Sequence, residues 1–203
     1  MNSLILVRHG ETEWNSDKRI QGSVDVPLSE AGRAQAVALA RALAEEGLRP
    51  DLIYTSDLQR SSETGRIVAG RLDVSDIRVS PLLRELDCGE WEGRLIEDLR
   101  QNEPALYEAW LDDPAKPLPG GESVLQLRAR AERFFRENAG DLAACPRVLI
   151  VAHGLMNRMI LSLLLKLDPQ QSRYFSQDNT AVNVFAWRGP RVYCDVWNRT
   201  CHL

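Results

Sequence analysis

The sequence predicts an α/β protein, a three-layer α/β/α sandwich with a mostly parallel central sheet and a small helical cap insert. Short, continuous apolar runs rich in β-branched residues, such as Leu4–Val7 and Val148–Ala152, are typical of buried parallel strands. Stretches with apolar residues at helical spacing alternate with these runs along the chain. That alternation favours helices packed on both faces of one sheet.

The expected strands cover, in chain order, residues 3–7, 51–54, 77–79, 148–152, 182–186 and 192–197. The last two form a closing pair around the turn at residues 188–190. The expected helices outside the cap cover residues 29–47, 58–70, 122–139 and 154–167. Ser29 and Asp57 stand before two of these helices and are their expected N-caps.

Residues 83–121 differ from the strand and helix alternation around them. They contain two short helical stretches, a Trp-Glu-Gly turn at 91–93 and a loop rich in proline and glycine at 112–121. We interpret them as a compact cap over the sheet edge, inserted in a single domain that spans residues 1–203. Trp14 and Trp91 are expected to be packing residues beside the ligand pocket. The alternative is that their rings contact the substrate directly.

Composition excludes several classes of function. The chain has 203 residues and a net charge of −4, which argues against nucleic acid as its main partner. No apolar run approaches the length of a membrane span, and the four apolar residues before Arg8 are too few for a signal-peptide core. We therefore expect a cytoplasmic protein with neither nucleic acid nor membrane as partner, and leave a homodimer open. The charged stretch at 128–137 is expected to be a solvated helix face.

The cysteines give no sign of a metal site. Their spacing matches neither Cys-x-x-Cys nor a Cys/His metal pattern, and four reduced thiols are expected. These residues are Cys88, Cys145, Cys194 and Cys201.

Two of the three histidines directly follow apolar runs. Arg8 and His9 come after the first strand, and His153 and Gly154 come after the fourth. In open α/β sheets the ligand crevice lies at the carboxyl ends of the strands. Two imidazoles and a guanidinium delivered to that edge indicate chemistry on an anionic group.

Five ordered motifs resemble the histidine phosphatase superfamily, and together they span nearly the whole chain. They are LVRHGETEWN at 6–15, SDLQR at 56–60, RELDCGEWEG at 84–93, GGES at 120–123 and AHG at 152–154. This family includes cofactor-dependent phosphoglycerate mutases and many phosphatases of small metabolites.

The residue set fits phosphoryl transfer. The imidazole of His9 is expected to attack phosphorus and to carry the phosphoryl group, which splits one displacement into two. Arg8 and Arg60 offer charged, forked donors to the equatorial oxygens, and His153 adds a further positive contact. Since these groups supply the electrostatic stabilisation that a metal supplies elsewhere, we expect no metal and no other cofactor. Glu85 is the expected general acid for the leaving oxygen and then the base for water.

The resemblance also implies residues that contact the substrate. In addition to the catalytic candidates Arg8, His9, Arg60, Glu85 and His153, the residues expected to contact the substrate are Asn15, Gln21, Gly22, Gly154 and His202. The tail 198–203 resembles the endings of metal-independent phosphoserine phosphatases, where it lies near the pocket. His202 is therefore a candidate contact for the non-phosphate end of the substrate. The alternative is an exposed histidine at the end of a closing strand.

Two features favour the phosphatase branch over the mutases. The segment between Glu85 and Gly120 is short, whereas mutases carry an extra cap insert. Leu155 and Met156 follow Gly154, where mutases have Asn and Ser. We expect a metal-independent hydrolase of a small acidic phosphometabolite, with phosphoserine as the first candidate. The alternatives are a cofactor-dependent phosphoglycerate mutase and an alpha-ribazole or broad-specificity phosphatase. A non-enzymatic binding module is disfavoured because every required position is filled.

Overall fold

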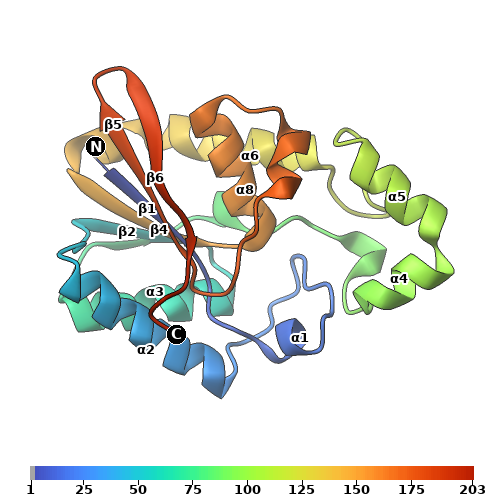
Figure 1. Ribbon diagram of the computed structural model, residues 1–203, viewed down its shortest axis with the longest axis horizontal. Helices are drawn as coiled ribbons and strands as arrows, with labels where there is room; N and C mark the ends of the chain where they lie inside the picture. The colour runs from blue at the N-terminus through green and yellow to red at the C-terminus, as the bar shows by residue number, and fades with distance from the viewer. Residues whose placement is uncertain (1–2) are drawn as a thin grey trace.

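The computed structural model describes residues 3–203 and is built around one six-stranded sheet in the order β3-β2-β4-β1-β5-β6 (Figure 1). The strands β3, β2, β4 and β1 pair in parallel, β5 pairs antiparallel with β1, and β6 pairs antiparallel with β5. Their bounds are β1 (Ser3–Arg8), β2 (Leu52–Thr55), β3 (Ile77–Val79), β4 (Arg147–Ala152), β5 (Val182–Arg188) and β6 (Arg191–Arg199). The predicted fold class is confirmed.

Helices cover both faces of the sheet, with α2 and α3 on one side and α6 and α8 on the other (Figure 1). The α-helices are α1 (Glu13–Ser16), α2 (Glu30–Glu45), α3 (Gln59–Leu72), α4 (Ile96–Asn102), α5 (Pro104–Asp112), α6 (Val124–Glu137), α7 (Ala139–Ala144) and α8 (Gly154–Leu165). Three 3₁₀ turns are η1 (Pro81–Leu83), η2 (Gly89–Trp91) and η3 (Pro169–Tyr174). Within residues 3–203, no helix is both long and apolar enough to cross a membrane.

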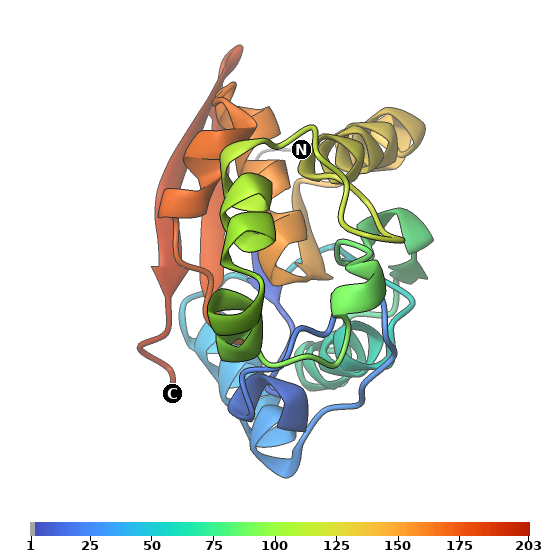
Figure 2. The same cartoon turned by 90° about the vertical axis from the view of Figure 1, so that its right-hand side faces the viewer.

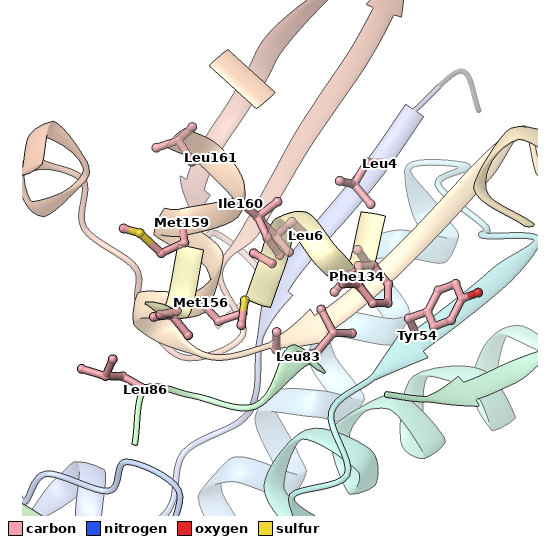
Figure 3. Packing of buried hydrophobic residues seen from close by; sticks show 14 of the residues in the cluster. Leu4, Leu6, Tyr54, Leu83, Leu86, Phe134, Met156, Met159, Ile160 and Leu161 are labelled. Atoms are coloured by element: carbon pink, nitrogen blue, oxygen red, sulfur yellow. The ribbon is translucent and has the colours of Figure 1, made fainter. Parts of the chain in front are cut away.

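Strand β1 is buried on both faces, as its continuous apolar run predicts. Leu4 and Leu6 belong to the core that also contains Phe134 of α6 and Ile160 of α8 (Figure 3). The intervening residues Ile5 and Val7 face the core under α2 and α3. Because successive side chains of a strand point to opposite faces, both alternating sets are buried and the register of β1 is strongly specified.

The helix expected over 122–139 is α6 (Val124–Glu137), and a separate short helix, α7, follows it. Ser123 caps α6 and forms a reciprocal capping box with Gln126. At the other end Asn138 stops α6, because its side-chain amide turns back to the carbonyl of Phe134 at 2.9 Å while its oxygen accepts from the Tyr54 hydroxyl at 3.0 Å. The helix α7 then starts anew.

The prediction that residues 128–137 form a solvated helix face is wrong for Arg130, because its side chain is only 17% exposed. Its guanidinium reaches across to the backbone of residues 82–85. The helical period alone does not reveal this contact, because a long side chain reaches groups beyond its own helix face.

The prediction of Asp57 as the N-cap of the second helix is also wrong. The N-cap position of α3 is Leu58, which makes no side-chain capping bond. Asp57 instead accepts from the Arg84 guanidinium at 2.8 Å, which lowers the pKa of the Asp57 carboxyl. Asp25, from a distant loop, accepts from the first helical N–H at Gln59 (2.6 Å) and does the capping.

Residues 83–121 lie beyond the carboxyl ends of the central strands, with α4 and α5 outermost (Figure 2). Trp91 is 1% exposed and packs against Tyr107 and Trp110, with ring centroids 6.0 and 5.7 Å away. It is therefore a packing residue of this cap segment. Gly89, at φ +51°, lies so close to the carbonyl oxygen of Pro119 that a Cβ would clash, and this contact ties the two ends of the segment together.

We expect Trp91→Ala to lower the free energy of unfolding by about 3–5 kcal/mol, since it removes the ring that joins Tyr107 and Trp110. Chemical denaturation measures this value. Leu125→Ala is the control, because Leu125 is 41% exposed and its loss is expected to cost about 0.5 kcal/mol. Equal losses for the two variants would contradict a cap held by this aromatic cluster.

Candidate active site

Parallel pairing of β1 with β4 brings the two predicted histidines together. The register sets Arg8 opposite Ala152, so that the next residues, His9 and His153, leave the sheet side by side. Their ring centroids are 5.1 Å apart, and both side chains are buried. The structure thus brings the two strand ends and their histidines together at one edge of the sheet.

His9 is held in one tautomer by its neighbour. Its Nδ1 lies 2.6 Å from the carbonyl oxygen of Gly10, which can only accept a hydrogen bond. In the neutral ring Nδ1 therefore carries the proton and Nε2 carries the free lone pair. The amide of Asn179 donates to the His9 carbonyl at 3.0 Å and steadies the backbone beneath the ring.

His153 is positioned from the opposite nitrogen. Its Nε2 lies 2.7 Å from Oγ of Ser56, which is fully buried at the end of β2. Its Nδ1 is buried and makes no hydrogen bond to the described residues. The ring is thus oriented by a third strand end, and Nδ1 stays free for a ligand.

Backbone carbonyls anchor the two arginines. Arg8 donates from Nη1 to the carbonyl of Gln177 at 2.7 Å. Arg60, fully buried on α3, donates to the carbonyls of Val24 and Gly22 at 2.6 and 2.8 Å. Neither guanidinium has a carboxylate partner within 4.0 Å among residues 3–203. In both side chains the Nε–H is buried without a partner among those residues, so both cations keep donors for an anion.

Glu85 lies against the first turn of α8. Its carboxylate accepts from the backbone N–H groups of Leu155 at 3.0 Å and Met156 at 3.1 Å, and also from Leu86 at 3.0 Å. The N-terminus of a helix carries unpaired N–H donors and a partial positive charge, which favours a carboxylate there. A Cβ at Gly154 would lie 3.6 Å from Oε2 of Glu85, an ordinary van der Waals distance, so this contact does not itself require glycine.

Burial sets the charge state of the site. Burial lowers the pKa of His9 well below 6.5, and the nearby charges of Arg60 and Arg8 lower it further. Burial and Arg60 act in the same direction on the pKa of His153. Burial also lowers the pKa of Arg60 to about 10, which leaves it charged at neutral pH. The site therefore combines two charged arginines with two neutral imidazoles.

These side chains open into a cleft of about 590 Å³. Its walls come from the inner site, from the loop after α1 and from the cap segment. The predicted residues that line it are Arg8, His9, Asn15, Gln21, Gly22, Arg60 and Glu85, whereas His153 and Gly154 are not among its lining residues. The structure adds lining residues that were not predicted, among them Cys88, Leu95, Ile96, Arg100, Leu155 and Asn179.

His202 is not part of this cleft, contrary to the expected substrate contact. The chain end turns toward α2 (Figure 1), where Arg199 pairs with Glu46. His202 bonds through Nε2 to Oγ1 of Thr180 at 3.1 Å and lines a separate hollow beside α2. The ion pair between Arg199 and Glu46 holds the chain end against α2, away from the cleft that His9 lines.

Sequence reasoning assigned no role to three residues that support the site, namely Ser56, Gln177 and Asn179. Ser56 stands in the second motif, and its position at the end of a predicted strand could have indicated a role in the site. The other two lie in a loop before β5 that shows no recognisable pattern. Among residues 3–203, no group of three or more His, Cys, Asp or Glu side chains is arranged to hold a metal ion.

Comparison with known proteins assigns the family. The sequence model of the histidine phosphatase superfamily (branch 1) matches residues 4–200. The chain belongs to this superfamily. Together with relatives that are named phosphatases, this membership shows an enzyme of the phosphatase class.

Individual relatives differ in their stated activities. Phosphoserine phosphatase 1 of Hydrogenobacter thermophilus is 34% identical, over 100% of this chain and 95% of its own length. A probable phosphoglycerate mutase of Photorhabdus laumondii is 36% identical, over 90% of this chain and 84% of its own length. A mycobacterial glucosyl-3-phosphoglycerate phosphatase, solved with VO3, superposes with a TM-score of 0.88 at 30% identity, covering 98% of this chain and 99% of that one.

The lowered pKa values predict an unusual response to pH. We expect the acid limb of the kcat/KM profile to lie below about pH 6.5, the ordinary value for histidine, because His9 stays neutral until more acidic conditions. Arg60→Met removes a cation and is expected to raise the pKa of His9, as measured by NMR titration of the imidazole. A wild-type His9 that titrates near the ordinary value would contradict the influence assigned to burial and to the two arginines.

Proposed function

We propose that this chain hydrolyses small acidic phosphomonoesters through a phosphohistidine intermediate on His9, without a metal ion. The observation that carries the proposal is the buried His9 ring, whose free Nε2 lone pair shares one cleft with two arginines and a carboxylate. A neutral imidazole is a nucleophile without prior loss of a proton. The surrounding donors match the charge of a phosphoryl group.

In the first step His9 Nε2 forms a bond to phosphorus as the bond from phosphorus to the ester oxygen breaks. Glu85 gives a proton to the departing oxygen, so that the alcohol leaves neutral. Arg8 and Arg60 donate to the equatorial oxygens, where negative charge is spread in the transition state. The unpartnered Nε–H groups of both arginines are available for this task.

In the second step water attacks the phosphohistidine. Glu85, now deprotonated, takes a proton from that water as the new oxygen–phosphorus bond forms and the nitrogen–phosphorus bond breaks. Inorganic phosphate leaves and His9 returns to its neutral form. In both steps His153 donates a hydrogen bond from Nδ1 to the phosphoryl group. The negative charge of that group raises the pKa of the imidazole and so favours its protonated form.

Support for the substrate comes from the family and from the cleft. Phosphoserine is our first candidate because relatives over the full chain length include a phosphoserine phosphatase. The named mutase among the relatives keeps phosphoglycerate mutase activity as the second candidate. Leu155 favours hydrolysis, since an apolar side chain lines the cleft at a position where mutases use asparagine.

His9→Ala is expected to abolish turnover, because the ring that accepts the phosphoryl group is lost. In the wild-type protein, rapid quenching during turnover should trap acid-labile, base-stable phosphate on His9, identified by peptide mapping. Label on a serine or an aspartate would overturn the assignment of the nucleophile.

Glu85→Gln is expected to slow hydrolysis of an alkyl phosphate by about 10²-fold or more, because glutamine cannot protonate the leaving oxygen. An aryl phosphate needs little protonation of its leaving group and should lose much less. Steady-state kcat on both substrates measures the difference. Equal losses would assign Glu85 another role.

The function itself is tested with a panel of phosphorylated metabolites assayed for phosphate release in the presence of a strong chelator. We expect rapid phosphate release from phosphoserine or a similar acidic ester, undiminished by the chelator. Activity that is restored only by added magnesium would overturn metal independence. Efficient interconversion of 2- and 3-phosphoglycerate with little free phosphate would instead establish the mutase.

A further inference from the structure

Glu85 lies in a part of the chain that no regular element supports. Residues 84–88 connect η1 with η2 and belong to neither a helix nor a strand. A general acid has to be held close to the leaving oxygen, since a misplacement of 1 Å costs up to about 10²-fold in rate. The position of the Glu85 backbone must therefore come from contacts with other elements.

Arg130 of α6 supplies most of these contacts. Its Nη1 donates to the carbonyls of Leu82 at 3.0 Å and Arg84 at 2.7 Å, and its Nη2 donates to the carbonyl of Glu85 itself at 2.8 Å. The remaining donors bond to the carboxylate of Glu122, Nε at 3.1 Å and Nη2 at 2.8 Å. These five bonds use every N–H of the guanidinium.

Glu122 extends the same network past Glu85 along the chain. Its Oε2 accepts from the Asp87 amide at 3.1 Å, and its own N–H donates to the Asp87 carbonyl at 2.8 Å. The ion pair with Arg130 is largely shielded, at 17% and 27% side-chain exposure. Residues 82–87 are thereby held along their length from the α6 side.

We propose that Arg130 and Glu122 form a clamp that positions Glu85 for proton transfer. This inference rests on the proposed function, in which Glu85 is the general acid. The clamp fixes the Glu85 backbone from α6, while the carboxylate rests on the first turn of α8. The backbone of Glu85 is therefore held from α6 and its carboxylate from α8. Neither clamp residue lines the cleft, so each acts as a positioning residue.

The chemistry of the clamp requires arginine. A planar guanidinium presents donors in fixed directions to several carbonyls at once, whereas lysine offers a single ammonium group. Arg130→Met keeps the length of the stem and removes every donor. Arg130→Lys keeps the charge and restores part of the contacts, and Glu122→Gln weakens the pairing. The matched control is Arg133→Met on the same helix, where Arg133 pairs with Glu137 and is 58% exposed.

The test measures kcat for an alkyl and an aryl phosphate in these variants. Arg130→Met is expected to lower kcat on the alkyl phosphate by about 10- to 10²-fold, with much less effect on the aryl phosphate. Arg130→Lys and Glu122→Gln should give smaller losses with the same selectivity, and they serve as the test if Arg130→Met does not fold. Arg133→Met should leave both rates unchanged.

A double-mutant cycle with Glu85→Gln shows whether Arg130 works through Glu85. In that background Arg130→Met should lower kcat on the alkyl phosphate by less than about 3-fold, because the group that it positions no longer transfers a proton. The clamp would be overturned if Arg130→Met lowered kcat equally on both substrates or did not lower it at all. It would also be overturned if Arg130→Met caused its full loss of kcat in the Glu85→Gln background. If Glu85→Gln itself shows no preference between the substrates, the general-acid role fails first, and the clamp falls with it.

Discussion

The parallel pairing of β1 with β4 is the constraint on which the site depends. It sets Arg8 opposite Ala152, so the two strands end at the same level and deliver His9 and His153 to the same point. The helix α8 begins directly after His153, and its first turn therefore faces the same cleft. One strand register thus places His9, the second imidazole and the helix N-terminus that receives Glu85. A slip of one residue would reverse the faces of β1 and separate these groups.

The buried cations determine the electrostatics of the site. Two guanidinium groups without carboxylate partners are costly to bury, and the carbonyls of Gln177, Gly22 and Val24 compensate only part of that cost. The same cations and the same burial keep the imidazoles neutral. The protein therefore holds a neutral imidazole beside two charged guanidinium groups. Binding of an anionic ester relieves the repulsion that the two cations impose on each other.

The cap segment and the sheet contribute different parts of the chemistry. Arg8, His9 and His153 follow the ends of β1 and β4, and Arg60 comes from α3. The cap segment brings Glu85 and the outer walls of the cleft, including Leu95 and Ile96. Its stability comes from aromatic packing around Trp91, from contacts with α6 and from backbone hydrogen bonds between residues 93–96 and residues 18–20.

The sequence by itself determined the fold class and the order of the strands along the chain, and it singled out Arg8, His9, Arg60, Glu85 and His153, which the structure brings close together. Periodicity reveals buried strands because burial on both faces leaves a continuous apolar run, and local motifs carry the reactive groups. Only the tertiary structure decided that Asp25 rather than Asp57 caps α3, that Arg130 holds the Glu85 backbone, and that His202 turns toward α2. Each of these depends on a contact between residues far apart in the chain. Such contacts follow from the geometry of packed elements, and no local pattern of residues encodes them.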